Sequence, residues 1–173
     1  MATKKSIRVL FGILMISACI LGSTILAGAE MMKCKNVATA IKDERIPVSD
    51  EEGHSLGVQI MEGLAFFENG EIARIRFHTI FDYIQGKGTQ AIGYTIYTFE
   101  DGSTFVARFQ RIMVADQSGN YSAKSTSELT KGTGRFEGIK GTISGTGKNF
   151  PLTKGEPSRV FNDYTITYTL PSK

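Results

Sequence analysis

The chain has 173 residues, a length that fits one domain. It holds 20 Lys and Arg against 17 Asp and Glu, and the three extra basic residues are Lys4, Lys5 and Arg8 near the N-terminus. The rest of the chain is therefore formally neutral, which argues against a basic nucleic-acid surface and against a polybasic membrane patch.

The N-terminal segment has the three parts of a secretory signal peptide. After the basic residues, an apolar run extends over Val9–Leu26, and small residues follow at Ala27–Ala29. We expect cleavage after Ala29 and a secreted or periplasmic protein. Two alternatives are a lipoprotein modified at Cys19, within Ile16-Ser17-Ala18-Cys19, and an uncleaved anchor. We favour cleavage, because the apolar run continues well past Cys19.

Residues 30–55 are polar and mixed, and we expect a loosely held lead-in with a short strand near Val37–Ile41. Cys34 is the only cysteine after the leader, so no intrachain disulfide is expected, and we interpret it as a bystander. His54 and His78 lack the spacing of metal ligands. We therefore expect neither a metal site nor a cofactor.

From residue 56 to 173 the pattern predicts one strand after another, without helical periodicity. Asn69-Gly70 and Asp101-Gly102 are typical of two-residue hairpin turns, and Asp116–Asn120 of a looser one. Strands joined only by turns pair antiparallel, and closure of the sheet removes exposed edges. The sequence therefore predicts an all-β domain, a single antiparallel barrel of about eight strands. The expected strands are Leu56–Glu68, Glu71–Ile84, Gln90–Glu100, Ser103–Ala115, Tyr121–Leu129, Lys140–Gly147 and Val160–Leu170.

A two-residue turn at Asn69-Gly70 would place Glu62 opposite Phe77, with both side chains on one face. That face has the greater apolar area, so we expect it to be the interior, with Glu62 as the one acid in its middle. Its expected members are Leu56, Val58, Ile60, Glu62, Leu64, Phe66, Ala73, Ile75, Phe77, Thr79 and Phe81.

The same reasoning at Asp101-Gly102 places Arg111 among apolar neighbours. The expected inner residues of this hairpin and of the last strand are Ile92, Tyr94, Ile96, Thr98, Phe105, Ala107, Phe109, Arg111, Met113, Asn162, Tyr164, Ile166, Tyr168 and Leu170. A lone buried charge costs several kcal/mol unless it is paired. We therefore expect Glu62 and Arg111 to contact each other, a tyrosine hydroxyl, water or a ligand; the alternative is that both reach solvent at the rim.

Residues 132–147 are rich in glycine. Glu137 stands where a dinucleotide-binding fingerprint needs its third glycine, and the segment lacks the Lys-Ser/Thr of a phosphate loop. We interpret these glycines as structural, allowing a strand to bend and another segment to approach closely.

The motif made by Gly132, Gly134, Phe136, Gly138 and Gly141 resembles the Gly-x-Gly-x-Phe-x-Gly-x-x-Gly segment of allene oxide cyclases, and dirigent proteins carry a similar segment. The resemblance implies a calycin-type barrel, a cavity for an apolar ligand, and a homo-oligomer, either trimer or dimer. It also implies that Glu62 corresponds to a glutamate that acts in the cyclase cavity. The barrel cysteine of that family has no expected counterpart, because Cys34 precedes the predicted barrel.

Three functional hypotheses follow, and we favour the first. A barrel that binds a hydrophobic small molecule would orient it with side chains of the inner face. Alternatively, a cofactor-independent cyclase or isomerase would use Glu62 to stabilise positive charge or to move a proton. The third hypothesis is a structural barrel without a ligand. The expected ligand-binding residues are Tyr94, Phe109, Arg111, Asn162, Tyr164 and Tyr168.

Overall fold

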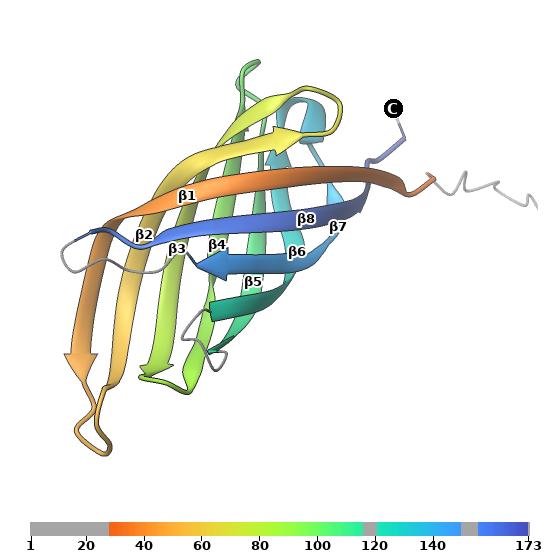
Figure 1. Cartoon of the computed structure of the whole chain (residues 1–173). Coiled ribbons are helices and arrows are strands. Elements are labelled where there is room, and N and C mark those ends of the chain that lie inside the picture. The colour runs from red at the N-terminus through yellow and green to blue at the C-terminus, as the bar shows by residue number, and fades with distance from the viewer. Residues whose placement is uncertain (1–27, 116–120, 150–155, 173) are drawn as a thin grey trace, which may run out of the picture.

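The computed structural model describes residues 28–115, 121–149 and 156–172. In these residues, eight strands form a closed antiparallel barrel in which each strand pairs with the next and the last pairs with the first (Figure 1). This confirms the predicted fold class. The elements are β1 Glu30–Pro47, β2 His54–Phe67, β3 Ile72–Ile84, β4 Gly88–Phe99, β5 Thr104–Ala115, β6 Tyr121–Thr133, the 3₁₀ helix η1 Gly134–Phe136, β7 Lys140–Asn149 and β8 Arg159–Thr169.

Two predicted features lie outside the described residues: the leader up to residue 27, with Cys19, and the turn at Asp116–Asn120. Within the part of the chain that is described, no helix is long and apolar enough to cross a membrane.

The first strand differs from the expected lead-in. β1 has 18 residues and pairs with β2 on one side and with β8 on the other, so it closes the barrel. Cys34, Asn36 and Ala38 alternate inward and are buried, while the residues between them are exposed. Most of the charges that favoured a loop lie on the outer face of the strand, and Cys34, Asn36 and Ala38 on the inner face are small and uncharged; the exception is Arg45, which faces the interior of the barrel.

The β2–β3 hairpin has a three-residue loop, Glu68-Asn69-Gly70, instead of the expected two-residue turn. The Phe67 N–H donates to the Glu71 carbonyl and the Gly70 N–H donates to the Phe67 carbonyl. Gly70 has a φ of 86°, which suits a loop whose last residue is left-handed. This shifts the pairing by one residue, so that Glu62 pairs with Arg76 rather than Phe77.

The β4–β5 hairpin shifts in the same way. The Phe99 N–H donates to the Ser103 carbonyl, and Tyr97 pairs with Phe105. Because side chains alternate between the two faces, a one-residue shift exchanges the faces of β2 and β4. The expected inner residues of these two strands are therefore wrong, whereas those of β3, β5 and β8 do face inward, with Thr79, Met113 and Leu170 only partly buried.

The corrected interior takes alternate residues from β2 to β5. Its buried apolar members are Met61, Ala65, Phe67, Ala73, Ile75, Phe77, Phe81, Ala91, Tyr97, Phe99, Phe105, Ala107 and Phe109. The outer face of the same strands also carries large exposed aliphatic side chains, among them a row in which Val58 pairs with Ile80 and Ile80 with Ile92. Both faces of β2 are thus apolar, and the comparison of apolar area alone predicted the wrong face as the interior.

An aromatic cluster fills one end of the barrel. The rings of Tyr97 and Phe105 stack with centroids 4.4 Å apart, and Phe67 and Phe99 pack beside them. The glycine-rich segment adds Phe136, whose centroid is 4.9 Å from that of Phe99 and 5.2 Å from that of Phe105. Here the motif from Gly132 to Gly141 turns the chain so that η1 closes this end.

Candidate functional site

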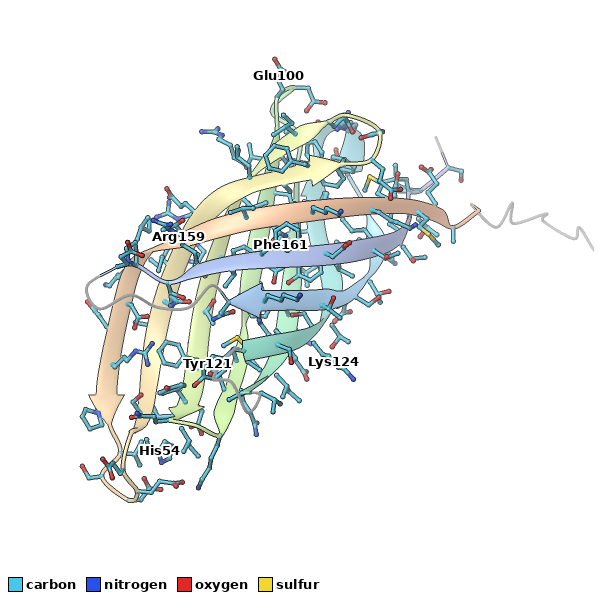
Figure 2. All side chains as sticks on the ribbon, viewed as in Figure 1. His54, Glu100, Tyr121, Lys124, Arg159 and Phe161 are labelled. Carbon is cyan, nitrogen blue, oxygen red and sulfur yellow. The ribbon has the colours of Figure 1, made fainter. Side chains whose placement is uncertain are left out.

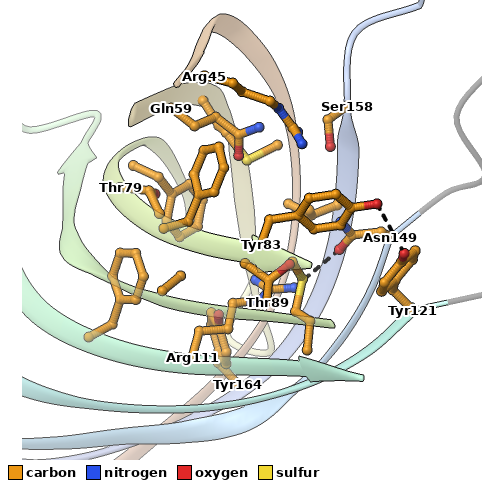
Figure 3. Close-up of a pocket in the computed structure, with 17 residues that line it drawn as sticks. Arg45, Gln59, Thr79, Tyr83, Thr89, Arg111, Tyr121, Asn149, Ser158 and Tyr164 are labelled. Carbon is orange, nitrogen blue, oxygen red and sulfur yellow. Dashed lines mark hydrogen bonds between the residues drawn. The ribbon is translucent and has the colours of Figure 1, made fainter. Parts of the chain in front are cut away.

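A cavity of about 370 Å³ occupies the other half of the barrel. Its outer residues, such as Arg45, Tyr83, Tyr121 and Ser158, lie at or next to strand ends, which makes that end the mouth (Figure 3). Its apolar walls are Met61, Phe77, Phe81, Ala91, Phe109, Met113 and Val160. The remaining lining residues are Gln59, Thr79, Thr89, Arg111, Asn149 and Tyr164.

Arg111 is the charged group of the inner part of this cavity. β5 points it inward, and only 9% of its surface is exposed. Nη1 donates to Oδ1 of Asn162 at 2.9 Å, and Nη2 lies 3.5 Å from Oδ1 of Asn149. Its Nε atom is buried without a hydrogen-bond partner. No carboxylate of residues 28–115, 121–149 or 156–172 lies within salt-bridge distance of it.

The electrostatic consequence is a positive charge held among neutral groups. Burial lowers the pKa of Arg111, and the neighbouring Tyr164 hydroxyl acts in the opposite direction. A guanidinium nevertheless stays protonated in proteins, so the positive charge of Arg111 persists on the cavity wall. Neutral acceptors compensate the loss of hydration only in part.

A chain of buried amides positions this arginine. Nδ2 of Asn162 donates to Oδ1 of Asn36 at 2.7 Å, and both residues are fully buried. A Cβ atom at Gly147 would lie 2.1 Å from Oδ1 of Asn162 and 2.8 Å from Nη2 of Arg111. Glycine at this position therefore leaves the space in which the arginine and the amide meet.

The mouth carries a second cation and a pair of tyrosines. Arg45 lies over the rings of Phe81 and Tyr83, 5.0 and 5.1 Å from their centroids, and its Nε donates to Oδ1 of Asp43 at 2.9 Å. The hydroxyl oxygens of Tyr83 and Tyr121 are 3.4 Å apart. Burial and the hydrogen bond to Tyr121 raise the pKa of Tyr83 to about 12. Unlike Arg111, the cation at the mouth has a carboxylate partner.

Five of the predicted site residues face the interior, but they do not form one group. Phe109, Arg111 and Tyr164 line the cavity, and Asn162 lies behind it and contacts Arg111. Tyr168 belongs to the opposite end, where its hydroxyl donates to Oε2 of Glu30 at 2.6 Å. Burial and this bond raise the pKa of Tyr168 to about 12.

Glu62 and Tyr94 point away from the interior, contrary to the prediction. Glu62 is exposed on the outer surface, where Oε1 lies 3.3 Å from Nε of Arg76. Tyr94 is 48% exposed. The one-residue shift of the two hairpins accounts for both corrections. Of the contacts predicted as alternatives for Glu62 and Arg111, the one with each other does not form; Arg111 instead lies beside the Tyr164 hydroxyl and two asparagine amides.

The sequence did not predict several of the lining residues, because the faces of β2 were exchanged and β1 was taken as a lead-in. Gln59 and Met61 belong to the alternate set of β2 that was assigned to the outside, and Arg45 belongs to the segment taken as a lead-in. The signal that could have identified the inner face of β2 was the apolar character of its odd-numbered residues, which include Met61, Ala65 and Phe67.

Outside the cavity, a polar cluster joins the β1–β2 loop to β3. Nδ1 of His54 contacts Oδ1 of Asp50, and Nε2 contacts Oδ1 of Asp82 at 2.9 Å. Ligand atoms of Asp50, Glu51 and His54 lie within 4.8 Å of one another. Figure 2 shows His54 at one end of the barrel and Glu100 at the other. Carboxylates engage both ring nitrogens, so ion pairing already accounts for this cluster.

Comparison with known proteins gives information on the fold alone. No protein-family model and no curated protein matches the chain. Among solved structures, the chain is similar to a beta-barrel like protein from Acinetobacter baumannii, with a TM-score of 0.54 and 10% sequence identity over 80% of this chain and 96% of that one. At this identity the similarity supports the small β-barrel fold alone.

Proposed function

We propose that the protein binds a small, mainly apolar molecule inside the barrel. The observation that carries the proposal is the cavity of about 370 Å³, whose walls combine seven apolar side chains with the rings of three tyrosines. Cavities of this size and composition, with a few convergent polar groups, are typical of small-molecule sites. The packed aromatic cluster at the opposite end makes the site a pocket with one mouth rather than a channel.

The geometry favours binding over the cyclase or isomerase hypothesis. Glu62, the residue on which that mechanism depended, lies on the outer surface. Among the lining residues that the structure describes there is no carboxylate to replace it. The predicted leader would place binding outside the cytoplasm, and β1 begins at Glu30, the residue that cleavage after Ala29 would leave first.

The test uses the neutral dye N-phenyl-1-naphthylamine, whose fluorescence increases in apolar surroundings. Ala91→Phe adds a ring to the cavity wall, whereas Ile92→Phe places the same ring on the outer face of the same strand. We expect saturable binding to the unchanged protein and to Ile92→Phe, and an affinity for Ala91→Phe that is lower by roughly tenfold or more.

Far-UV circular dichroism verifies that both variants keep their strands. Binding by the unchanged protein that does not saturate would refute the proposal. So would equal affinities for the dye in a folded Ala91→Phe and in Ile92→Phe.

A further inference from the structure

We infer that the ligand of this cavity is an organic anion, a compact carboxylate or similar oxyacid whose negative group lies against Arg111 and whose apolar body lies along the apolar walls. This inference rests on the proposed binding function. It adds the chemical class of the ligand and its orientation.

Arg111 has more hydrogen-bond donors than the surrounding residues have acceptors for it. A guanidinium has five N–H donors. The two asparagine oxygens, on Asn162 and Asn149, accept from Nη1 and Nη2, and Nε has no partner. Nε itself is buried, but the side chain lines the cavity, so an oxyacid there would meet the Nη hydrogens that the two asparagines leave free. Arginine and carboxylate form paired, charge-assisted hydrogen bonds with well-matched geometry.

Arg111 also lacks a negatively charged partner among the described residues. Among the described residues, four of the six exposed arginines have a carboxylate nearby; the pairs are Arg45 with Asp43, Arg76 with Glu62, Arg108 with Glu128 and Arg135 with Glu71. The other two, Arg74 and Arg159, are hydrated at the surface, whereas the buried Arg111 has neither a carboxylate nor full contact with water. An uncompensated charge is most costly where water is excluded. A protein that keeps a cation there, positioned by Asn162 and Asn36, gains most from an anion that enters with the ligand.

The two cations of the cavity differ in how well they can attract a negative group. Arg111 lies inside the end of β5 at Ala115, beyond Met113, while Phe109 and Phe77 line the cavity at greater depth. Figure 3 shows Arg111 beside Tyr164 at one side of the pocket and Arg45 at the opposite side. Because the cation at the mouth is already paired with Asp43, the stronger attraction for a negative group is at Arg111.

The test compares two probes with the same apolar body, 4-phenylbutyrate and the neutral 4-phenylbutan-1-ol, by titration calorimetry on the unchanged protein at neutral pH. We expect the acid to bind more tightly by roughly tenfold or more, as a charge-assisted pair would give. Equal or weaker binding of the acid overturns the inference. If the alcohol binds and the acid does not, the cavity still binds apolar molecules and only the inferred class fails. If neither probe nor the neutral dye binds, the proposed function fails too.

Variants then locate the negative group through the ratio of the two affinities, which a general loss of stability would not change selectively. Arg111→Met should bring the acid to within about threefold of the alcohol. Arg108→Met, on the outer face of the same strand, is the matched control and should keep the ratio of the unchanged protein. A larger loss of the ratio in Arg45→Met than in Arg111→Met would overturn the orientation. If Arg111→Met does not fold, the two probes on the unchanged protein still decide the ligand class.

Discussion

Phe66 and Phe67 are adjacent on β2, and truncating each to alanine tests which face of the strand is inside. The ring of Phe67 lies 5.2 Å from that of Phe99 and 6.4 Å from that of Tyr97, and only 6% of the residue is exposed. Removing a buried phenylalanine leaves a cavity and costs about 3–5 kcal/mol of unfolding free energy. Phe66 is 45% exposed on the outer face, so its truncation should cost about 1 kcal/mol.

Urea unfolding followed by far-UV circular dichroism measures both free energies, and equal m-values would show that the two variants unfold from states of similar compactness. The two substitutions remove the same side chain from neighbouring positions, so intrinsic strand propensity nearly cancels between them. If Phe66→Ala lost as much stability as Phe67→Ala or more, the one-residue shift at Asn69-Gly70 would be wrong, and Glu62 would return to the interior.

Three further predictions concern single residues. Burial raises the pKa of Cys34 to about 12, so iodoacetamide should label it only as fast as the protein unfolds, and rapid labelling of the folded protein would contradict its inward position. Glu62→Gln breaks one exposed ion pair and should change stability by less than about 1 kcal/mol and leave dye affinity unchanged in fluorescence titration. Hydrogen bonds to Asp50 and Asp82 raise the pKa of His54 in the folded protein above the 6.5 of the unfolded chain. The stabilisation of the fold by protonated His54 is therefore complete below pH 6.5 and is lost as pH rises through the folded pKa. Urea unfolding should therefore show a larger advantage over His54→Gln at about pH 5.5 than at about pH 8.5, and a constant difference would refute this.

The local pattern of the chain was enough to predict the barrel. The expected strands of the second half overlap the observed ones closely, as in Ser103–Ala115 against Thr104–Ala115, because glycine and polar turn residues separate runs of β-branched and aromatic residues. On β8 the regular alternation of Asn162, Tyr164, Ile166 and Tyr168 with polar residues correctly predicted the buried face, because only one of its faces is strongly apolar.

On β2 the sequence left two registers open. Asn-Gly is compatible with a two-residue turn and with a three-residue loop that ends in a left-handed glycine. Both faces of the strand are apolar, so hydrophobicity did not distinguish Phe66 from Phe67. The hydrogen bonds of the closed hairpin decided the register, and with it the outward position of Glu62.

The sequence by itself determined the strands from β2 to β8 and the inward position of Arg111, because each depends on residues close together along the chain. Only the tertiary structure decided what surrounds that arginine. Asn149 and Asn162 reach it from β7 and β8, and Asn36 on β1 holds Asn162 in turn. Arg45 joins the cavity from a segment whose many charges are typical of a loop. Such neighbours are set by pairing between strands far apart in sequence, and β1 becomes recognisable as a strand only where β2 and β8 supply its hydrogen-bond partners.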